Sequence, residues 1–342
     1  MQGKGIIKVL LSSLAAFALI TSTALFSQAS AAPLVLKFAG QNPPEHFATT
    51  SMKEIAKEVE QKTNGRIQIR VFPANQLGDY SLVYEELIRG TIEMAAISFP
   101  SQFDSRMDII YVQGYTASYK QVAKAYDPNG WFFKKMDQFN TALGVKLLGM
   151  YLEGMVGIGT VKEIREPLNP KVDHGVLLRI PNMDVFKTAL EGAKFRTISI
   201  PFADVYQSMQ TGVCDGDSGY SIVAAYTALS DVIKHWYNYN KNTECLGVMI
   251  SNKVWAKLSK EDQQVLKAAV AKQTAMSIKN AEANDKKYLA LMEKKGIKVH
   301  TYSTKELQPM MKAFSSTWGK LDQSKGKELM NDFKKEMKKI SD

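Results

Sequence analysis

Cysteine and histidine are scarce in this sequence, whose 342 residues include two Cys and four His. It contains no CxxC pair, no HExxH motif and no Walker phosphate loop, which are sequence signatures of zinc sites, metalloproteases and nucleotide-binding loops. With no general base, metal set or phosphate loop to build on, the sequence favours binding over catalysis. It predicts no cofactor and no metal ion.

The two cysteines, Cys214 and Cys245, leave a choice open. In an oxidising compartment they could form a disulfide. The bond would close a loop of about 30 residues and stabilise the fold by roughly 3–4 kcal/mol through chain entropy. The alternative is two buried free thiols.

Long hydrophobic runs are absent after the N-terminus, where no uncharged run approaches the roughly 20 residues that span a bilayer. Residues 1–31 are typical of a secretory signal peptide. Lys4 and Lys8 accompany the apolar run Val9–Phe26, and residues 29–31 (Ala-Ser-Ala) form a small-x-small cleavage site. A membrane anchor is the weaker alternative, because Ser and Thr interrupt the apolar run. We expect export, cleavage near Ala31 and a mature chain that begins at Ala32.

The formal net charge is +10, and it becomes +8 (42 basic minus 34 acidic residues) when Lys4 and Lys8 leave with the signal peptide. A basic chain can bind nucleic acid. Export argues against that partner, and much of the excess lies in lysine-rich helical stretches such as Asp332–Ile340. The charge therefore indicates only a weak attraction for anionic ligands and no nucleic-acid partner.

The first half of the chain alternates strands and helices. Hydrophobic periodicity predicts strands at Leu34–Gly40, Arg66–Pro73 and Ile92–Phe99, separated by helices at Glu45–Gly65 and Tyr80–Gly90. This order predicts a parallel, doubly wound α/β sheet. Ligands of such sheets bind beyond the carboxyl ends of the strands.

The rest of the chain predicts a second α/β lobe and one very long helix. The predicted helices are Tyr119–Thr141, Met183–Glu191, Pro201–Gln210, Ser221–Asp231 and Ser259–Lys295, and the predicted strands are Val145–Tyr151, Met155–Thr160, Val176–Ile180, Cys245–Ser251 and Ile297–Ser303. We expect each lobe to be a sheet flanked by helices, with the long helix bracing both. Lobe I comprises residues 32–155 plus about 245–285, and lobe II about 156–244 plus 286–342. A cleft between two lobes would enclose a small ligand.

The stretch CDGDSGY, Cys214–Tyr220, is similar to the run around the nucleophile of chymotrypsin-like proteases, with Ser218 as the nucleophile. Such a serine needs a histidine base, and none of the four histidines lies in the sequence context of that base. The 124 residues after Ser218 (342 − 218) are mostly helical and lysine-rich. An exported serine hydrolase is therefore a remote alternative.

Several segments together resemble the TRAP-type, DctP-like periplasmic substrate-binding proteins. The segments, in chain order, are Glu58–Asp79 (EVEQKTNGRIQIRVFPANQLGD), Gly90–Ser98 (GTIEMAAIS), Val176–Pro181 (VLLRIP), Phe186–Ala193 (FKTALEGA), Ile200–Gly216 (IPFADVYQSMQTGVCDG) and Ser251–Ala269 (SNKVWAKLSKEDQQVLKAA). The resemblance implies a two-lobe periplasmic-binding-protein fold without enzymatic activity. It also implies a location in the periplasm, a small organic anion as ligand, and delivery of that anion to ion-driven inner-membrane TRAP permease subunits. A binding protein of an ABC importer or a sensor is the alternative.

The resemblance implies that Arg179 binds the carboxylate of the substrate. A guanidinium in an apolar strand needs an anionic partner, and its planar fork holds a carboxylate through two hydrogen bonds. The alternative is an internal salt bridge. If Arg179 binds the ligand, Arg179→Ala abolishes binding with little loss of fold. Val156 and Gly219 stand where many relatives carry an arginine and an asparagine. This departure favours a monocarboxylate, such as an aromatic, keto or amino acid, with a sulfonate as the alternative.

Further candidates for ligand contact come from strand ends, loops and the Asp-Gly turn. Structural alternatives exist for several of them, such as a helix cap for His46, loop fixing for Gln76 and core packing for Trp236. Glu244 could recognise an ammonium group. The full set is His46, Gln76, Ser98, Gln102, Tyr151, Glu153, Asp217, Ser218, Tyr220, Trp236 and Glu244.

Overall fold

The computed structural model describes residues 32–115 and 118–341. The predicted signal peptide lies outside the described residues. None of the helices in the described part is long and apolar enough to cross a membrane.

The predicted alternation of strands and helices at the start of the chain is confirmed. Strands β1 (Leu34–Gly40), β2 (Ile67–Phe72) and β3 (Met94–Ile97) are joined by helices α1 (Phe47–Lys62) and α2 (Tyr80–Arg89). β1 lies between β2 and β3 and pairs with both in parallel. Side chains alternate across β1, so Leu36 and Phe38 join the apolar core under α1 while Ala39 faces the other core.

Two long antiparallel strands, β4 (Val145–Thr160) and β8 (His235–Ser251), form the centre of the sheet. The sequence predicted β4 as two strands and only the end of β8. β4 is continuous but bulged, and one bulge falls at Gly154, where φ is +144° and a Cβ would overlap the carboxylate of Asp285. Glycine is therefore required at this bend.

Within the described residues, the strands form one nine-stranded sheet in the order β2-β1-β3-β8-β4-β7-β5-β6, with β9 added on β8. The short strands are β5 (Leu177–Ile180), β6 (Arg196–Ser199), β7 (Gly216–Asp217) and β9 (Lys298–Thr301). The predicted α/β fold, with a sheet flanked by helices and one long helix, is confirmed, and a single sheet serves both ends because β4 and β8 run through them. We call β2, β1 and β3 the first half of the sheet, and β7, β5 and β6 the second half. The predicted lobe boundaries stay a prediction.

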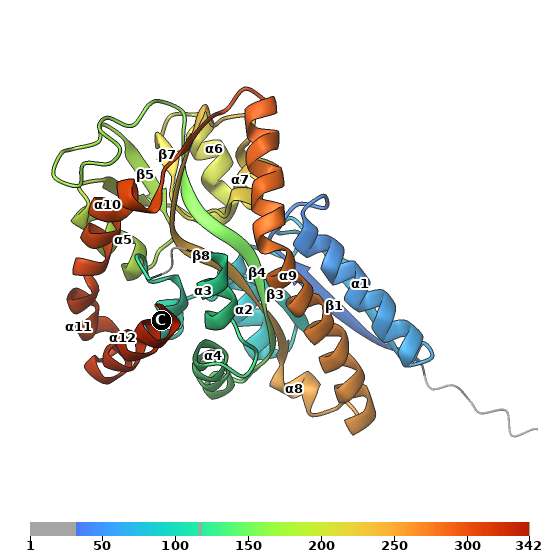
Figure 1. Ribbon diagram of the computed structural model, residues 1–342. Coiled ribbons are helices and arrows are strands. Elements are labelled where there is room, and N and C mark those ends of the chain that lie inside the picture. The colour runs from blue at the N-terminus through green and yellow to red at the C-terminus, as the bar shows by residue number, and fades with distance from the viewer. Residues whose placement is uncertain (1–31, 116–117, 342) are drawn as a thin grey trace, which may run out of the picture. The chain divides into compact units, whose positions relative to one another are not determined.

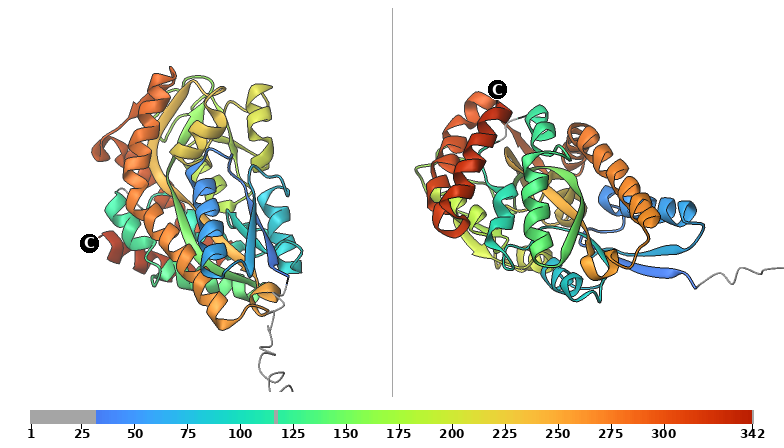
Figure 2. Two further views of the ribbon diagram at one scale, coloured as in Figure 1. Left: turned by 90° about the vertical axis from the view of Figure 1, so that its right-hand side faces the viewer. Right: turned by 90° about the horizontal axis from the view of Figure 1, so that it is seen from below.

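Helices cover both faces of the sheet (Figures 1 and 2). The predicted helix at 119–141 is two helices, because Pro128 and Gly130 interrupt it. The remaining helical segments, in chain order, are η1 (Ser105–Tyr111), α3 (Tyr119–Ala125), α4 (Trp131–Ala142), α5 (Asp184–Gly192), η2 (Phe202–Asp204), α6 (Val205–Gln210), α7 (Ile222–Leu229), α8 (Asn252–Trp255), α9 (Lys260–Lys294), α10 (Thr304–Ser316), η3 (Trp318–Leu321), α11 (Asp322–Lys325) and α12 (Lys327–Ser341).

The long helix α9 was predicted almost to the residue, and Ser259 caps it by accepting from the backbone N–H of Asp262. In Figure 1 it runs along β4, and it also contacts α1 at one end of the sheet and α7 and β9 at the other. Because one helix packs on elements from both halves, it links them.

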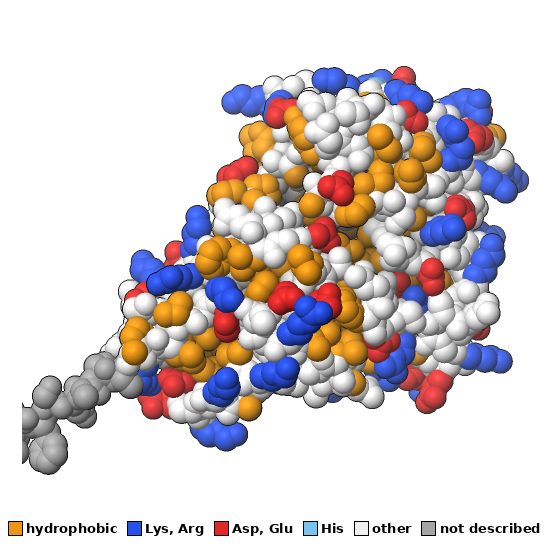
Figure 3. Space-filling model, turned by 180° about the vertical axis from the view of Figure 1, so that it is seen from behind, with side chains coloured by type: hydrophobic (Ala, Val, Ile, Leu, Met, Phe, Trp, Pro, Cys, Tyr) orange, Lys and Arg blue, Asp and Glu red, His pale blue; other side chains and the backbone are white. Residues whose placement is uncertain are grey.

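On one face of the molecule, basic side chains are interspersed with acidic ones. On the face shown in Figure 3, Lys and Arg alternate with Asp and Glu. Interspersed charges of both signs are typical of a solvated surface.

Candidate functional site

A narrow cavity lies between the two halves of the sheet, at the carboxyl ends of β1, β3 and β5. Its empty volume is about 380 Å³, but the centre of a water molecule can occupy only about 20 Å³ of it, little more than one water needs. The lining residues are Gln41, Tyr80, Ser98, Tyr111, Glu153, Arg179, Pro181, Met183, Phe186, Phe202, Gly219, Tyr220, Ala224 and Glu244. The side chains of these residues leave only a narrow space between the two walls.

The guanidinium of Arg179 forms one wall of the cavity. Arg179 lies on β5 with 1% of its surface exposed, and its Nε donates to the carbonyl of Ile200 at 2.8 Å while Nη1 donates to Asp217 Oδ1 at 3.1 Å. Nη2 has no hydrogen-bond partner among the described residues. Arg179 therefore forms an internal ion pair with Asp217 and also lines the cavity. An internal salt bridge and a role in ligand binding, the two alternatives from the sequence, are thus compatible.

The Asp-Gly turn holds Arg179 in place. The second carboxylate oxygen of Asp217 accepts from the backbone N–H of Gly219 at 2.8 Å and of Tyr220 at 3.0 Å. A Cβ at position 219 would lie 2.8 Å from Arg179 Nη1, so glycine leaves room for the guanidinium. Ser218 is fully buried in this turn and its Oγ has no hydrogen-bond partner, which leaves it no base to act as a nucleophile.

Two carboxyl groups, Glu153 on β4 and Glu244 on β8, line the cavity together with Arg179. Glu153 accepts from Asn42 Nδ2 and from Ser221 Oγ, and Glu244 accepts from Ser98 Oγ at 2.7 Å. Burial raises the pKa of both carboxyl groups, and the charge of Glu153 raises that of Glu244 further. A ligand that brings hydrogen-bond donors or positive charge would stabilise the ionised carboxylates and lower both pKa values again.

A buried lysine that the sequence did not suggest lies behind this wall. Lys241 on β8 is fully buried, donates to Asn242 Oδ1 at 3.0 Å and lies 5.1 Å from the ring centroid of Phe186. Burial lowers the pKa of Lys241 to about 7. The negative charges of Asp217 and Glu244 act in the other direction and raise this pKa, but they offset only part of the effect of burial. Its positive charge lowers the pKa of Glu244 and so offsets part of the effect of burial there.

Aromatic and apolar side chains complete the cavity. Phe202 and Tyr220 stack with ring centroids 4.6 Å apart, and the Tyr220 hydroxyl donates to the carbonyl of Phe202 at 3.1 Å. The sequence did not identify Tyr80, Tyr111, Met183, Phe186 or Phe202 as lining residues. They come from five separate helices and connections, so no local pattern brings them together.

Five of the predicted residues line the cavity: Ser98, Glu153, Arg179, Tyr220 and Glu244. Asp217 acts through Arg179, and His46 caps α1 by accepting from the Ala48 N–H, with its Nε2 3.8 Å from Glu153 Oε1. The Tyr151 hydroxyl bonds to Ser51 at 3.0 Å. Neither His46 nor Tyr151 lines the cavity.

Three predicted contacts do not line the cavity, and their contact with a ligand stays a prediction. Gln76 and Gln102 are exposed, in the segments that follow β2 and β3. Trp236 is buried against Gly157 and is part of the core.

The possible disulfide is also corrected, because Cys214 and Cys245 are both free and buried. β4 separates β8, which carries Cys245, from β7, which follows Cys214. Two strand spacings of about 4.8 Å each exceed the Cα separation of about 7 Å that a disulfide can bridge.

A small charged cavity between two halves of a mixed α/β sheet defines a solute-binding class of protein. The chain belongs to the family of bacterial extracellular solute-binding proteins, family 7 (DctP). The sequence model of this family matches residues 38–325. The predicted family is thus confirmed, and it comprises TRAP binding proteins rather than enzymes, which removes the serine hydrolase alternative.

The relatives agree with this membership. An uncharacterized protein of Haemophilus influenzae is 27% identical over 80% of this chain and 83% of its own. The sialic acid-binding periplasmic protein SiaP of Vibrio cholerae is 24% identical over 79% of this chain and 84% of its own. The sugar acid binding protein DctPAm of Advenella mimigardefordensis, solved with galactonate, superposes with a TM-score of 0.83 at 18% identity, over 90% of this chain and 99% of its own. At that identity the superposition shows the fold alone.

Proposed function

We propose that this protein captures a small organic monocarboxylate that carries hydrogen-bond donors, and delivers it to the permease subunits of a TRAP transporter. The observation that carries the proposal is Arg179, which lines a narrow cavity together with two buried carboxyl groups and whose Nη2 donates to none of the described residues. Membership of the family supports the transport role and a location in the periplasm.

The charges in the cavity distinguish the two ends of the ligand. A carboxylate gains charge-assisted hydrogen bonds from Arg179. Burial already raises the pKa of Glu153 and Glu244, and a second carboxylate beside them would raise both pKa values further, because water is excluded there and like charges repel. Hydroxyl groups or an ammonium group can instead donate to these two side chains. The relative SiaP, named for sialic acid, supports a hydroxylated acid, whereas other relatives are named for C4-dicarboxylates, so the choice of a monocarboxylate rests on the cavity itself.

A ligand as large as a sugar acid requires the walls of the narrow cavity to move. The space open to water centres, about 20 Å³, is too small for a sugar acid, so the two walls must separate to admit one. A hinge motion that closes the walls on the ligand would exclude water and strengthen its ion pair with Arg179. We place the moving lobes at the predicted boundaries, residues 32–155 with about 245–285 against about 156–244 with 286–342. The closed form would then dock on the permease.

A thermal-shift screen followed by calorimetry tests the proposal. The panel contains galactonate, an aromatic keto acid, phenylalanine and succinate. A monocarboxylate with donor groups should raise the melting temperature, because it binds only the folded protein, and succinate should raise it less. Tighter binding of succinate than of every monocarboxylate would refute the proposed ligand class.

Glu244→Gln distinguishes a ligand that donates from an ammonium group from one that donates from hydroxyl groups. It keeps the size of the side chain and an oxygen acceptor for Ser98, but it removes the negative charge. An amino acid ligand should lose affinity on this change, whereas a hydroxylated acid should lose little. Exposed Glu282→Gln on α9 is the matched control and should bind like the unmodified protein.

A further inference from the structure

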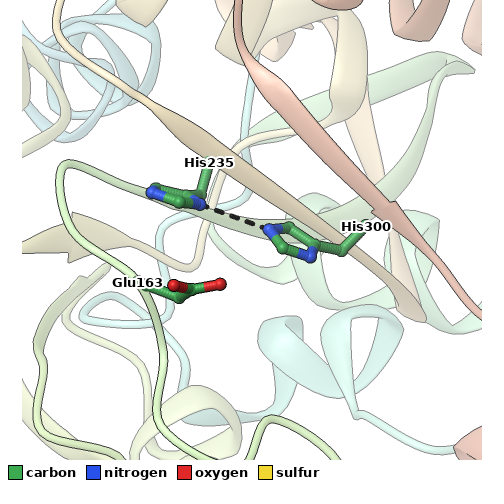
Figure 4. A group of neighbouring side chains, drawn as sticks. All are labelled: Glu163, His235 and His300. Atoms are coloured by element: carbon green, nitrogen blue, oxygen red, sulfur yellow. Dashed lines mark hydrogen bonds between the residues drawn. The ribbon is translucent and has the colours of Figure 1, made fainter.

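A second group of chemically reactive side chains lies outside the cavity, where β8 begins. Glu163, in the loop after β4, His235, the first residue of β8, and His300, on β9, each offer one ligand atom, and these atoms all lie within 4.8 Å of one another. Figure 4 shows the two imidazole rings facing each other and the carboxylate beside them. None of these residues takes part in the solute cavity.

The two histidines are held in a fixed arrangement by the sheet. β8 and β9 pair in parallel, with His235 opposite Lys298 and Tyr237 opposite His300. The ring of Tyr237 stacks on that of His300, with centroids 4.1 Å apart and 2° between the planes. The pairing and the stacking limit the rotation of His300, so its Nε2 stays directed at His235.

The spacing of the facing nitrogens fits two ligands of one metal ion. His235 Nδ1 and His300 Nε2 are 3.2 Å apart. With zinc–nitrogen bonds of about 2.0–2.1 Å, this spacing gives an N–Zn–N angle of roughly 100°, near the tetrahedral value. The two nitrogens also form a hydrogen bond, in which one ring donates and the other accepts. A metal ion placed between them would accept the lone pairs of both.

Glu163 can supply a third ligand. Its side chain is 62% exposed and pairs with Lys298 Nζ at 3.2 Å, so the carboxylate can turn toward a metal ion without leaving a buried position. Lys298 therefore competes with a metal ion for Glu163, and its charge repels a cation.

We propose that Glu163, His235 and His300 bind one divalent transition-metal ion, with Zn²⁺ as the fitting example and one position left for water. Two imidazoles and a carboxylate are ligands that zinc accepts, whereas Mg²⁺ and Ca²⁺ prefer oxygen alone. The ion would connect the loop after β4 to β8 and to β9, which leads into α10. The site goes beyond solute capture, and the separation of the three residues along the chain explains why the sequence did not predict a metal.

Calorimetry with ZnCl₂ tests the site, on protein exported with its own leader and purified without a histidine tag. We expect one Zn²⁺ per chain, a higher melting temperature with Zn²⁺ but not with Mg²⁺, and at least about 10-fold weaker binding for His235→Asn and for His300→Gln. No binding of Zn²⁺ by the unmodified protein would overturn the proposal. Unchanged affinity in the variant that combines both substitutions would also overturn it.

Lys298→Met provides a test that does not depend on damaging the site. It removes the competing cation and frees Glu163, so Zn²⁺ should bind more tightly. Lys279→Met, an exposed lysine on α9, is the matched control and should leave the affinity unchanged. Equal affinities in the two variants would exclude Glu163 as a ligand. The proposed solute function does not enter this result, because solute binding can be measured separately.

Discussion

Replacing Arg179 with methionine should damage stability and binding together, and a second substitution should separate the two effects. Arg179 and Asp217 are buried, with 1% and 2% exposed, and their charged atoms lie 3.1 Å apart. Removing one partner of a buried pair typically costs about 3–5 kcal/mol, because the other charge is left without compensation. The sequence predicted little loss of fold for Arg179→Ala. The pair with Asp217 leads us to expect a large loss.

The combined variant Arg179→Met/Asp217→Asn should recover most of that stability. Asparagine removes the stranded charge, and its side-chain oxygen can still accept from the backbone N–H groups of Gly219 and Tyr220. Binding should not recover, because the guanidinium is still missing. One charge-assisted hydrogen bond contributes about 1.5–3 kcal/mol. Its loss should raise the dissociation constant by roughly 10- to 100-fold.

Urea unfolding followed by tryptophan fluorescence measures the first effect, and calorimetry with a ligand found in the screen measures the second. If Arg179→Met were as stable as the unmodified protein, Asp217 would not depend on the pair. If the combined variant bound its ligand with unchanged affinity, Arg179 would not be the carboxylate anchor.

Two further predictions concern buried groups away from the cavity. Burial raises the pKa of Asp285 from 3.8 to about 7, so its contribution to stability is present at low pH and is lost as the pH rises through 7. Asp285→Asn should therefore reduce the fall in unfolding free energy between pH 4 and 8 by up to about 4 kcal/mol, and parallel curves in urea titrations would contradict this. Cys214 and Cys245 should react with a thiol reagent only after unfolding, and two thiols per chain should then be counted. A melting temperature that falls when a reductant is added would show that the two form a disulfide instead.

Local signals were sufficient to predict the first strands and helices and the long helix. Leu34–Gly40 shows an apolar alternation that ends in glycine, and Lys260–Lys294 has a serine cap and no breaker. Each of these patterns depends only on neighbouring residues. For that reason the periods of two and 3.6 residues located the elements correctly.

The two central strands could not be predicted because their signals are not local. Gly154, Gly157 and Gly159 in β4 look like a turn, yet they accommodate Asp285 and Trp236 from other elements. The polar run around Lys241 in β8 looks like a loop, but neighbouring strands bury it. Long-range packing overrode local propensity in both cases.

The cavity was predictable only in part. Arg179 was a candidate because a charge inside an apolar strand needs a partner, and the rule for strand ends identified Ser98, which lines the cavity. Tyr80 and Tyr111 have no such feature. An aromatic residue that faces a ligand and one that faces the core have the same helical spacing.

The continuous sheet constrains how the cavity can open. Because β4 and β8 run through both halves, the halves cannot separate without bending these strands, and a strand bends most easily at a bulge. The register of β4 shifts between Leu152 and Gly154 and again between Val156 and Ile158. Glu153 lies within the first shift, so a ligand that binds Glu153 contacts the sheet where it must bend. Closure and recognition would then depend on the same segment, and rigidifying Gly154 should impair both.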